Sequence, residues 1–174
     1  MPYPVTHVLL PMLIVETYRR YFAKKKFSKW YVFFAGLMGG APDFDFFYAW
    51  LMTGSFRLEY HRLLSHSLLV STVLAAIGLG IYALHKNKIL KYKGWRVSYM
   101  LIFIASLGIA LHTIADGFDG LTHWFYPLSW TLNMPNLVLN EFRAAILDGV
   151  LLFIWILYDP DLLKDILRIL RLKR

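Results

Sequence analysis

Histidine and aspartate residues recur at helical spacing between Leu111 and Pro127, where a long apolar stretch of the chain ends. Four of them follow each other at i, i+4, i+7 and i+11, the repeat of one helix face: His112, Asp116, Asp119 and His123. An imidazole and a carboxylate four residues apart leave a helix about one turn apart, so His112 and Asp116 can hold one cation between them. The alternative is that this pair is a hydrogen-bonded couple in a protein core.

Three further segments carry residues of the same types. They hold His7 after Thr6, Asp43 and Asp45 after Pro42, and the set His61, Arg62 and His66. Five of the six histidines therefore lie in four segments. A fold that brings these segments together would gather several metal ligands at one place.

The region after Asp116 is expected to be irregular. Gly117 and Gly120 disfavour helix, so we expect Asp119 and His123 on a loop. Aromatic residues farther along this region are expected to anchor it at the membrane interface: Trp124, Tyr126 and Trp130.

Any metal would be held by nitrogen and oxygen, because the chain has no cysteine. Four or more imidazoles with three or four carboxylates exceed the needs of one tetrahedral ion, so we expect two metals and leave a third open. Zinc is the first expectation, and manganese or iron would accept the same ligands. Asp45 is a candidate catalytic base, or else a helix cap. Arg62 is the candidate for binding a phosphate in catalysis, unless it pairs with a nearby aspartate.

The composition is that of an integral membrane protein. Hydrophobic residues make up 58% of the 174 residues, while charged residues make up only 17% and aromatic residues 17%. The formal net charge of +8 is concentrated in three clusters: Arg19–Lys29, Lys86–Arg96 and Lys164–Arg174. We interpret these clusters as topology signals and contacts for anionic lipids, and we expect no nucleic-acid partner.

The apolar segments predict an all-α, polytopic membrane bundle of about four to five transmembrane helices. Leu63–Leu84 and Val97–Ala115 are the clear spans, and residues 7–22, 30–47 and 144–158 are shorter segments that we expect to cross as well. The aromatic stretch Phe44–Tyr60 is broken at Thr53–Ser55 and is expected to lie at the membrane interface. Residues 1–158 are expected to form one domain, and residues 159–174 a basic amphipathic helix on the membrane surface.

Tracing this chain through a bilayer separates the basic clusters from the metal candidates. If all five segments cross, the three basic clusters lie on one side, which the positive-inside rule makes cytoplasmic. The histidine and aspartate candidates then meet at the opposite, non-cytoplasmic end. Ionisable residues at the edge of a bilayer are candidates for function, so we favour one joint polar site.

The order of these motifs resembles the LexA-regulated inner-membrane family of metal-dependent hydrolases (YdjM-like) over roughly residues 1–130. The shared elements are Thr6-His7, Ala41-Pro42-Asp43-Phe44-Asp45, His61-Arg62 with Ser65-His66-Ser67, His112-x-x-x-Asp116 and Pro127-Leu128. That family is similar in turn to the zinc-dependent phospholipase C and single-strand nuclease superfamily. The resemblance implies a helical fold around a metal cluster that hydrolyses phosphoesters.

The same resemblance implies a set of ligands in this chain. They are His7, Asp43, His61, His66, His112, Asp116 and His123. The chain lacks the superfamily's later His-x-x-x-Glu pair, so two metals are the expected number.

These features predict a metal-dependent hydrolase of the inner membrane that cleaves a phosphoester of a lipid-like substrate at the non-cytoplasmic interface. The aromatic surroundings of the motifs favour a phospholipid or a polyprenyl phosphate. The alternative is a small transporter or channel that moves divalent ions or protons through the same residues. Such a path needs polar groups across the bilayer, where Glu16 and Asp148 are almost the only ones. A third hypothesis, a membrane anchor for partner proteins, leaves the histidines and aspartates without a role.

Overall fold

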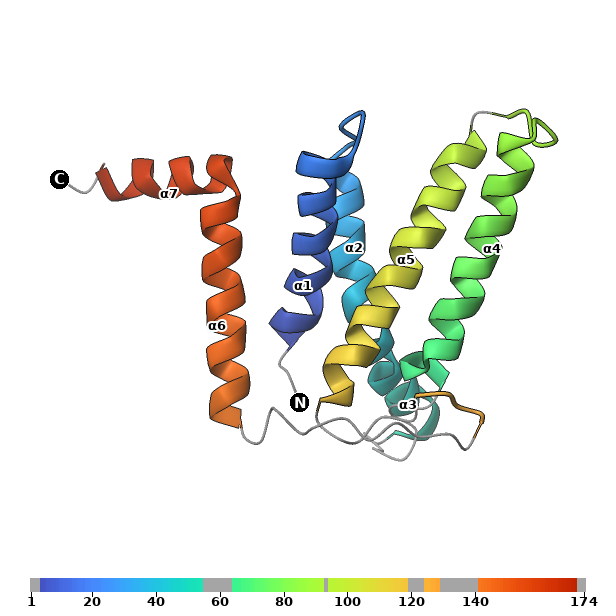
Figure 1. Ribbon diagram of the computed structural model, residues 1–174. Helices are drawn as coiled ribbons and strands as arrows, with labels where there is room; N and C mark the ends of the chain where they lie inside the picture. Colours follow the sequence, from blue (N-terminus) through green and yellow to red (C-terminus); the bar gives the residue numbers. More distant parts are fainter. Residues whose placement is uncertain (1–3, 55–63, 93, 119–123, 129–140, 172–174) are drawn as a thin grey trace.

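The computed structural model describes residues 4–54, 64–92, 94–118, 124–128 and 141–171 (Figure 1). These residues contain helices and no strand, so the all-α prediction is confirmed. The long elements are α1 (Pro4–Thr17), α2 (Trp30–Gly40), α4 (Leu68–Lys86), α5 (Gly94–Gly117), α6 (Glu141–Tyr158) and α7 (Pro160–Arg171). The short ones are the π-helix η1 (Tyr18–Phe22), the 3-10 helices η2 (Ala41–Phe44) and η4 (Leu64–His66), and α3 (Asp45–Thr53).

Local hydrogen bonds set the helix limits near the candidate residues. α4 begins at Leu68, later than predicted, because Ser67 is its N-cap and the Ser67 Oγ accepts a bond from the Leu69 amide at 3.1 Å. α3 ends at Thr53, and Gly54 follows it in the left-handed region with a φ of 69°. The predicted break of the aromatic stretch is therefore confirmed at Gly54.

Helices α1, α2 and α5 form the centre of the bundle, with α4 packed on α5 and α6 packed on α1 (Figure 1). Two glycines let the central helices touch. A Cβ at Gly39 would lie 2.1 Å from the carbonyl oxygen of His7, and a Cβ at Gly108 would lie 2.9 Å from the amide nitrogen of Gly39. Because no larger side chain fits there, the three backbones meet at the end of the bundle that carries His7.

The bundle has a small apolar core and an extensive apolar exterior. The core consists of Leu9, Met12, Val15, Val32, Ala35 and Ile104. Large apolar side chains such as Phe33, Leu79 and Phe153 are exposed on the outer faces of the helices. Exposed apolar area of this extent is typical of a surface that faces lipid or a partner protein.

Two helices, α4 and α5, are long and apolar enough to cross a membrane. Helices α1 and α2 are shorter, with 14 and 11 residues, and α6 carries three charged residues in its 18. Crossing by these three helices, and with it a bundle of four to five spans, stays a prediction. Helix α7 turns away at the end of α6, as expected for a helix on a membrane surface (Figure 1).

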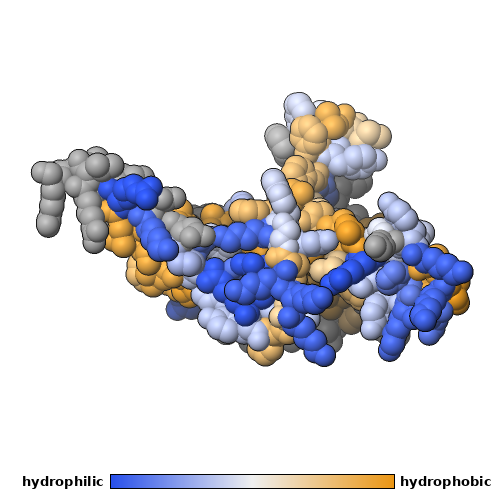
Figure 2. Space-filling view, turned by 90° about the horizontal axis from the view of Figure 1, so that it is seen from above, coloured by the Kyte–Doolittle hydropathy of each residue, from blue (hydrophilic) through white to orange (hydrophobic). Residues whose placement is uncertain are grey.

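The two ends of the bundle differ in charge. One end carries η1, the α4–α5 connection and α7, and hydrophilic residues gather on it (Figure 2). Arg19 and Arg20 pair there with Glu16, and Lys29 pairs with Asp159 at 3.6 Å. We call this the basic end. The start of α1, α3 and the start of α4 lie at the opposite end (Figure 1).

The expectation that Trp124 anchors an interface is wrong, because the Trp124 side chain is only 2% exposed. Its ring lies against Gly117, where an added Cβ would be 1.9 Å from the indole. The Trp124 carbonyl accepts a hydrogen bond from the Leu68 amide at 2.8 Å, which ties this turn to the start of α4. Gly117 thus provides the space for a buried indole as well as the end of α5. Trp130 lies outside the described residues.

Candidate metal centre

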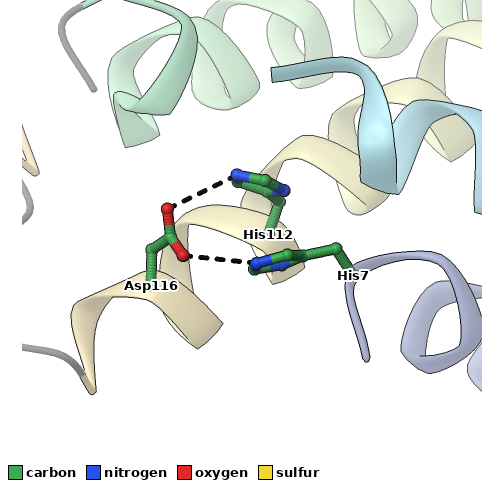
Figure 3. A group of neighbouring side chains, drawn as sticks. All are labelled: His7, His112 and Asp116. Carbon is green, nitrogen blue, oxygen red and sulfur yellow. Dashed lines mark ion pairs between the residues drawn. The ribbon is translucent and has the colours of Figure 1, made fainter. Parts of the chain in front are cut away.

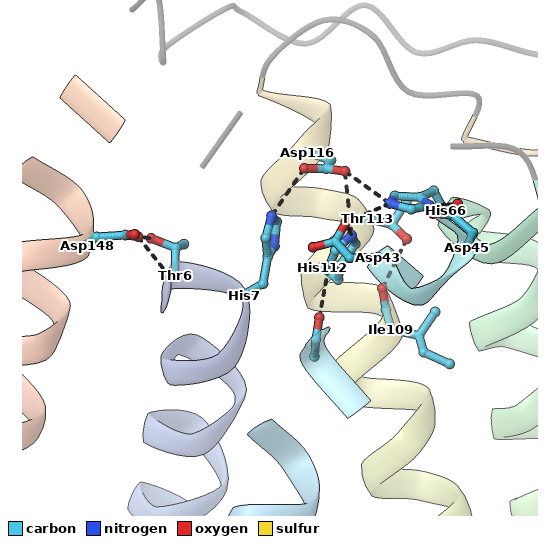
Figure 4. A network of polar contacts seen from close by, with 11 residues as sticks. Thr6, His7, Asp43, Asp45, His66, Ile109, His112, Thr113, Asp116 and Asp148 are labelled. Atoms are coloured by element: carbon cyan, nitrogen blue, oxygen red, sulfur yellow. Dashed lines mark hydrogen bonds and ion pairs between the residues drawn. The ribbon is translucent and has the colours of Figure 1, made fainter. Parts of the chain in front are cut away.

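Five predicted ligands from four elements meet at the end of the bundle opposite the basic end (Figure 4; three of them in Figure 3). They are His7 on α1, Asp43 on η2, His66 on η4, and His112 and Asp116 on α5. Ligand atoms of His7, His112 and Asp116 lie within 4.8 Å of one another, as do those of Asp43, His66 and His112. The fold therefore joins segments that lie far apart in the sequence.

Asp116 lies at the middle of this cluster. Its Oδ2 is 3.4 Å from the Nε2 of His66 and 3.5 Å from the Nε2 of His112. Its Oδ1 is 3.3 Å from the Nε2 of His7 (Figure 3). One oxygen of the carboxylate thus faces His66 and His112, and the other faces His7.

Asp43 closes a ring of four ligand atoms. Its Oδ1 lies 3.5 Å from the Nε2 of His66 and 3.6 Å from the Nε2 of His112. Together with Asp116 Oδ2, the four atoms alternate between nitrogen and oxygen. Charge-assisted N–H···O bonds are shorter, about 2.7–2.9 Å. Ligand atoms about 2.0–2.1 Å from a tetrahedral ion lie roughly 3.3–3.5 Å apart, so the ring fits one shared cation better than direct hydrogen bonds.

His112 is held in the tautomer that a metal ligand needs. Its Nδ1 lies 2.7 Å from the carbonyl oxygen of Gly39, so the Nδ1–H donates to that carbonyl (Figure 4). The lone pair of Nε2 then faces the cluster, and Nε2 makes no hydrogen bond within the described part of the chain. An outer hydrogen bond of this kind is characteristic of metal-binding histidines. The side chain of His112 is completely buried.

His66 is oriented by a similar pair of outer contacts. Ser65 Oγ donates to Asp45 Oδ2 at 2.7 Å and lies 3.0 Å from His66 Nδ1, while Asp45 Oδ2 itself is 3.3 Å from that nitrogen. Asp45 therefore lies behind His66, on the side away from the ring of ligand atoms. Asp45 is not the N-cap of α3, because that position is occupied by Phe44.

The carboxylates around His66 change its titration. Burial lowers the pKa of the His66 imidazole, but Asp43 and Asp45 outweigh burial and hold the pKa above its ordinary value. Burial raises the pKa of Asp43, but His66 and the imidazoles of His112 and His7 outweigh it, so this pKa lies below its ordinary value. Without a cation, the surroundings of the cluster therefore shift the two pKa values toward an ionised Asp43 and a protonated His66.

The position of His7 depends on α6. The Asp148 carboxylate accepts hydrogen bonds from the Thr6 amide at 2.8 Å and from the Thr6 hydroxyl, which satisfies the open start of α1 (Figure 4). The next residue, His7, stacks its ring on His112 with centroids 3.9 Å apart. Asp148 thus fixes the helix end from which His7 reaches the cluster.

Several contacts of the cluster were not predicted from the sequence. The Gly39 carbonyl gave no signal beyond its place before the Asp43 motif, and Asp148 was visible only as a lone carboxylate in an apolar helix. The predicted residues His61, Arg62, Asp119 and His123 lie outside the described residues. Their roles as ligands, as phosphate contact or in a loop stay predictions.

Comparison with known proteins supports a membrane assignment. A family model described as YdjM inner membrane protein matches residues 1–161, a range that includes every residue of the cluster. No curated protein and no solved structure matches the chain. The relation to the phospholipase C and nuclease superfamily therefore stays a prediction.

Proposed function

The chain belongs to the YdjM inner membrane protein family, and we propose on that premise that its buried cluster makes it a membrane-bound metal-dependent hydrolase. The observation that carries this proposal is the ring of alternating nitrogen and oxygen atoms at 3.4–3.6 Å, which fits a shared cation. A core hydrogen-bonded couple would bring His112 and Asp116 closer together than 3.5 Å.

In this proposal Asp43, His66, His112 and Asp116 hold one divalent cation. Zinc suits two imidazoles and two carboxylates, and manganese or iron would accept the same set. Asp116 Oδ1 and His7 would contribute to a second cation. When bound, such cations polarise a phosphoryl oxygen and lower the pKa of coordinated water.

The chain's own residues prepare this chemistry. Gly39 and the pair Asp45–Ser65 fix the ring orientations of His112 and His66, so little reorganisation is needed when a cation binds. Asp43 is the most accessible of the five, with 31% of its side chain exposed, whereas His66 and His112 are completely buried. A substrate would therefore approach from the side of Asp43.

A second feature near Asp43 supports a lipid-like substrate. A groove of about 650 Å³ runs between α3 and the start of α4. Asp45 and Ser65 line it, and most of its other walls are apolar, from Ala49, Met52, Leu64 and Val70. A phosphoester at the cluster could thus place an apolar chain in this groove, as a phospholipid or polyprenyl phosphate would.

The proposed setting is a bundle of four to five spans in the inner membrane. Its basic end would be cytoplasmic by the positive-inside rule, which places the cluster at the non-cytoplasmic interface. The transporter alternative is less well supported, because α1 carries only apolar residues between His7 and Glu16. Moreover, Glu16 pairs with Arg19 and Arg20, and Asp148 accepts a hydrogen bond from Thr6.

Metal analysis of the purified protein tests this function. Detergent-solubilised wild-type protein should contain at least one equivalent of a divalent metal and should release phosphate or a phosphoalcohol from mixed micelles that contain phospholipid. A chelator should abolish the release, and the removed metal should restore it. Folded wild-type protein that binds no divalent metal even after reconstitution would exclude the proposed hydrolase.

A further inference from the structure

A second groove, of about 880 Å³, opens at the basic end, away from the metal centre. It lies between α1–η1 on one side and α4–α5 on the other. Its α5 wall is a single helix face with residues three or four apart: Arg96, Tyr99, Met100, Phe103, Ile104 and Leu107. From Arg96 to Leu107 this face extends about 16 Å along the helix. That length is close to half of a hydrocarbon core of roughly 30 Å, or one lipid leaflet.

The groove has cations at one end and no acid in its wall. Lys24, Lys25 and Arg96 line it and are exposed. In the parts of the chain that the structure describes, no carboxylate pairs with any of these three. Their neighbours behave differently, since Arg19 and Arg20 pair with Glu16. The basic end therefore neutralises some of its cations internally, and the three that line this groove are among those without a carboxylate partner in the described residues.

The chemistry of the lining changes along its length. Tyr18, Tyr82 and Tyr99 add hydroxyl groups to it, and apolar side chains from Ile14 and Val15 to Phe103 continue deeper between the helices. Cations at the membrane surface followed by apolar walls, together about one leaflet deep, match the two parts of a single molecule. An anionic headgroup would meet the cations and an acyl chain would fill the channel.

We propose that this groove binds one anionic phospholipid from the leaflet at the basic end. Its phosphate contacts Lys24, Lys25 and Arg96, and one acyl chain lies along the α5 face toward Leu107. Lipids that merely surround the bundle would not need three cations at one groove that lack a carboxylate partner among the described residues. This site is separate from the metal centre and does not depend on the proposed hydrolysis.

Native mass spectrometry of the purified protein in detergent tests this site. Dioleoylphosphatidylglycerol and dioleoylphosphatidylcholine are titrated into delipidated protein. The wild type should retain one phosphatidylglycerol with at least about tenfold preference over phosphatidylcholine, since each basic residue near the surface favours an anionic lipid. The triple variant Lys24→Gln, Lys25→Gln, Arg96→Gln should lose this preference.

A matched control removes the same charge from the same end of the bundle. The variant Lys86→Gln, Lys88→Gln, Lys91→Gln should keep the wild-type preference, because these lysines do not line the groove. Met100→Trp should lower retention by filling the channel, and glycerol phosphate without acyl chains should bind far more weakly than the lipid. The proposal is overturned if both triple variants lose the preference equally, if Met100→Trp retains the lipid fully, or if glycerol phosphate binds as well as phosphatidylglycerol.

Discussion

Substitution of Asp116 is the most direct test of the proposed metal binding. This residue is 1% exposed and lies between imidazoles on both sides. Asp116→Asn keeps the shape and removes the charge that a cation needs, so metal content should fall strongly and hydrolysis should be abolished. Loss of a metal that generates the nucleophile would raise the activation barrier of hydrolysis by several kcal/mol. Melting of the metal-free protein should change little, because the cost of a buried charge is also removed.

Elemental analysis and thermal unfolding of Asp116→Asn should be compared with Asp159→Asn. Asp159 pairs with Lys29 at the basic end and should leave the metal content at the wild-type level. If Asp116→Asn unfolds while its folded fraction keeps a full metal content, the carboxylate is a structural hydrogen-bond partner. Asp119→Asn is expected to do markedly less than Asp116→Asn.

The raised pKa of His66 gives opposite pH dependences with and without metal. In the metal-free protein, the protonated imidazole stabilises the fold fully below its ordinary value of 6.5. This contribution is lost as the pH rises through the raised pKa. A cation must displace the same proton, so metal affinity should rise over that range. Unfolding experiments and metal titrations across this pH range measure the two trends. Asp45→Asn should weaken the loss of stability with rising pH. Parallel trends would contradict the assignment of His66.

The residue types and spacings of the five cluster members could be predicted, because metal ligands belong to a small chemical set. Their outer partners could not. The Gly39 carbonyl reaches His112 only through the packing of α2 on α5, and every residue has a carbonyl. Asp45 could be predicted as important but not as a partner of His66, since that depends on where η4 lies.

At the level of helices, Gly39 controls the distance between α1 and α2. Gly39→Ala would place a Cβ 2.1 Å from the His7 carbonyl, so α1 must move and His7 with it. Overpacking of this kind costs about 1–3 kcal/mol or more. Thermal unfolding should show a clear loss, and metal content should fall.

Gly80→Ala provides the control on an exposed helix face. Nothing lies within 4 Å of a Cβ there, so the variant should be neutral or more stable by up to about 1 kcal/mol. Equal effects of the two substitutions would mean that helix propensity, and not the close contact of α1 and α2, decides the result.

The two helices that are long and apolar enough to cross a membrane, α4 and α5, could be predicted because a run of about twenty apolar residues is a strong signal for such a helix. The start of α4 was placed too early because Leu64–His66 forms a 3-10 turn before the Ser67 cap, and an apolar run does not reveal that turn. Trp124 was assigned to an interface from its type. Its burial depends on space beside Gly117, which only the packed structure provides.

At the level of the whole molecule, charge and cluster lie at opposite ends, which predicts their sidedness. The chain has no cysteine, so single cysteines can be introduced without background. Lys88→Cys, in the α4–α5 connection, and Thr53→Cys, at the end of α3, should react with an impermeant reagent from opposite sides of a sealed membrane. Lys88→Cys should react from the cytoplasmic side. Labelling of both positions from one side would contradict the bundle of spans.

Helix α6 docks mainly on α1 and is the last long helix of the bundle to be made. All five cluster residues lie before Phe118, so a ribosome has delivered the whole cluster before α6 emerges. Yet Asp148 on α6 binds Thr6 at the start of α1, beside His7. The contact that orders the start of α1 therefore forms only after α6 has been made, which is later than every residue of the cluster.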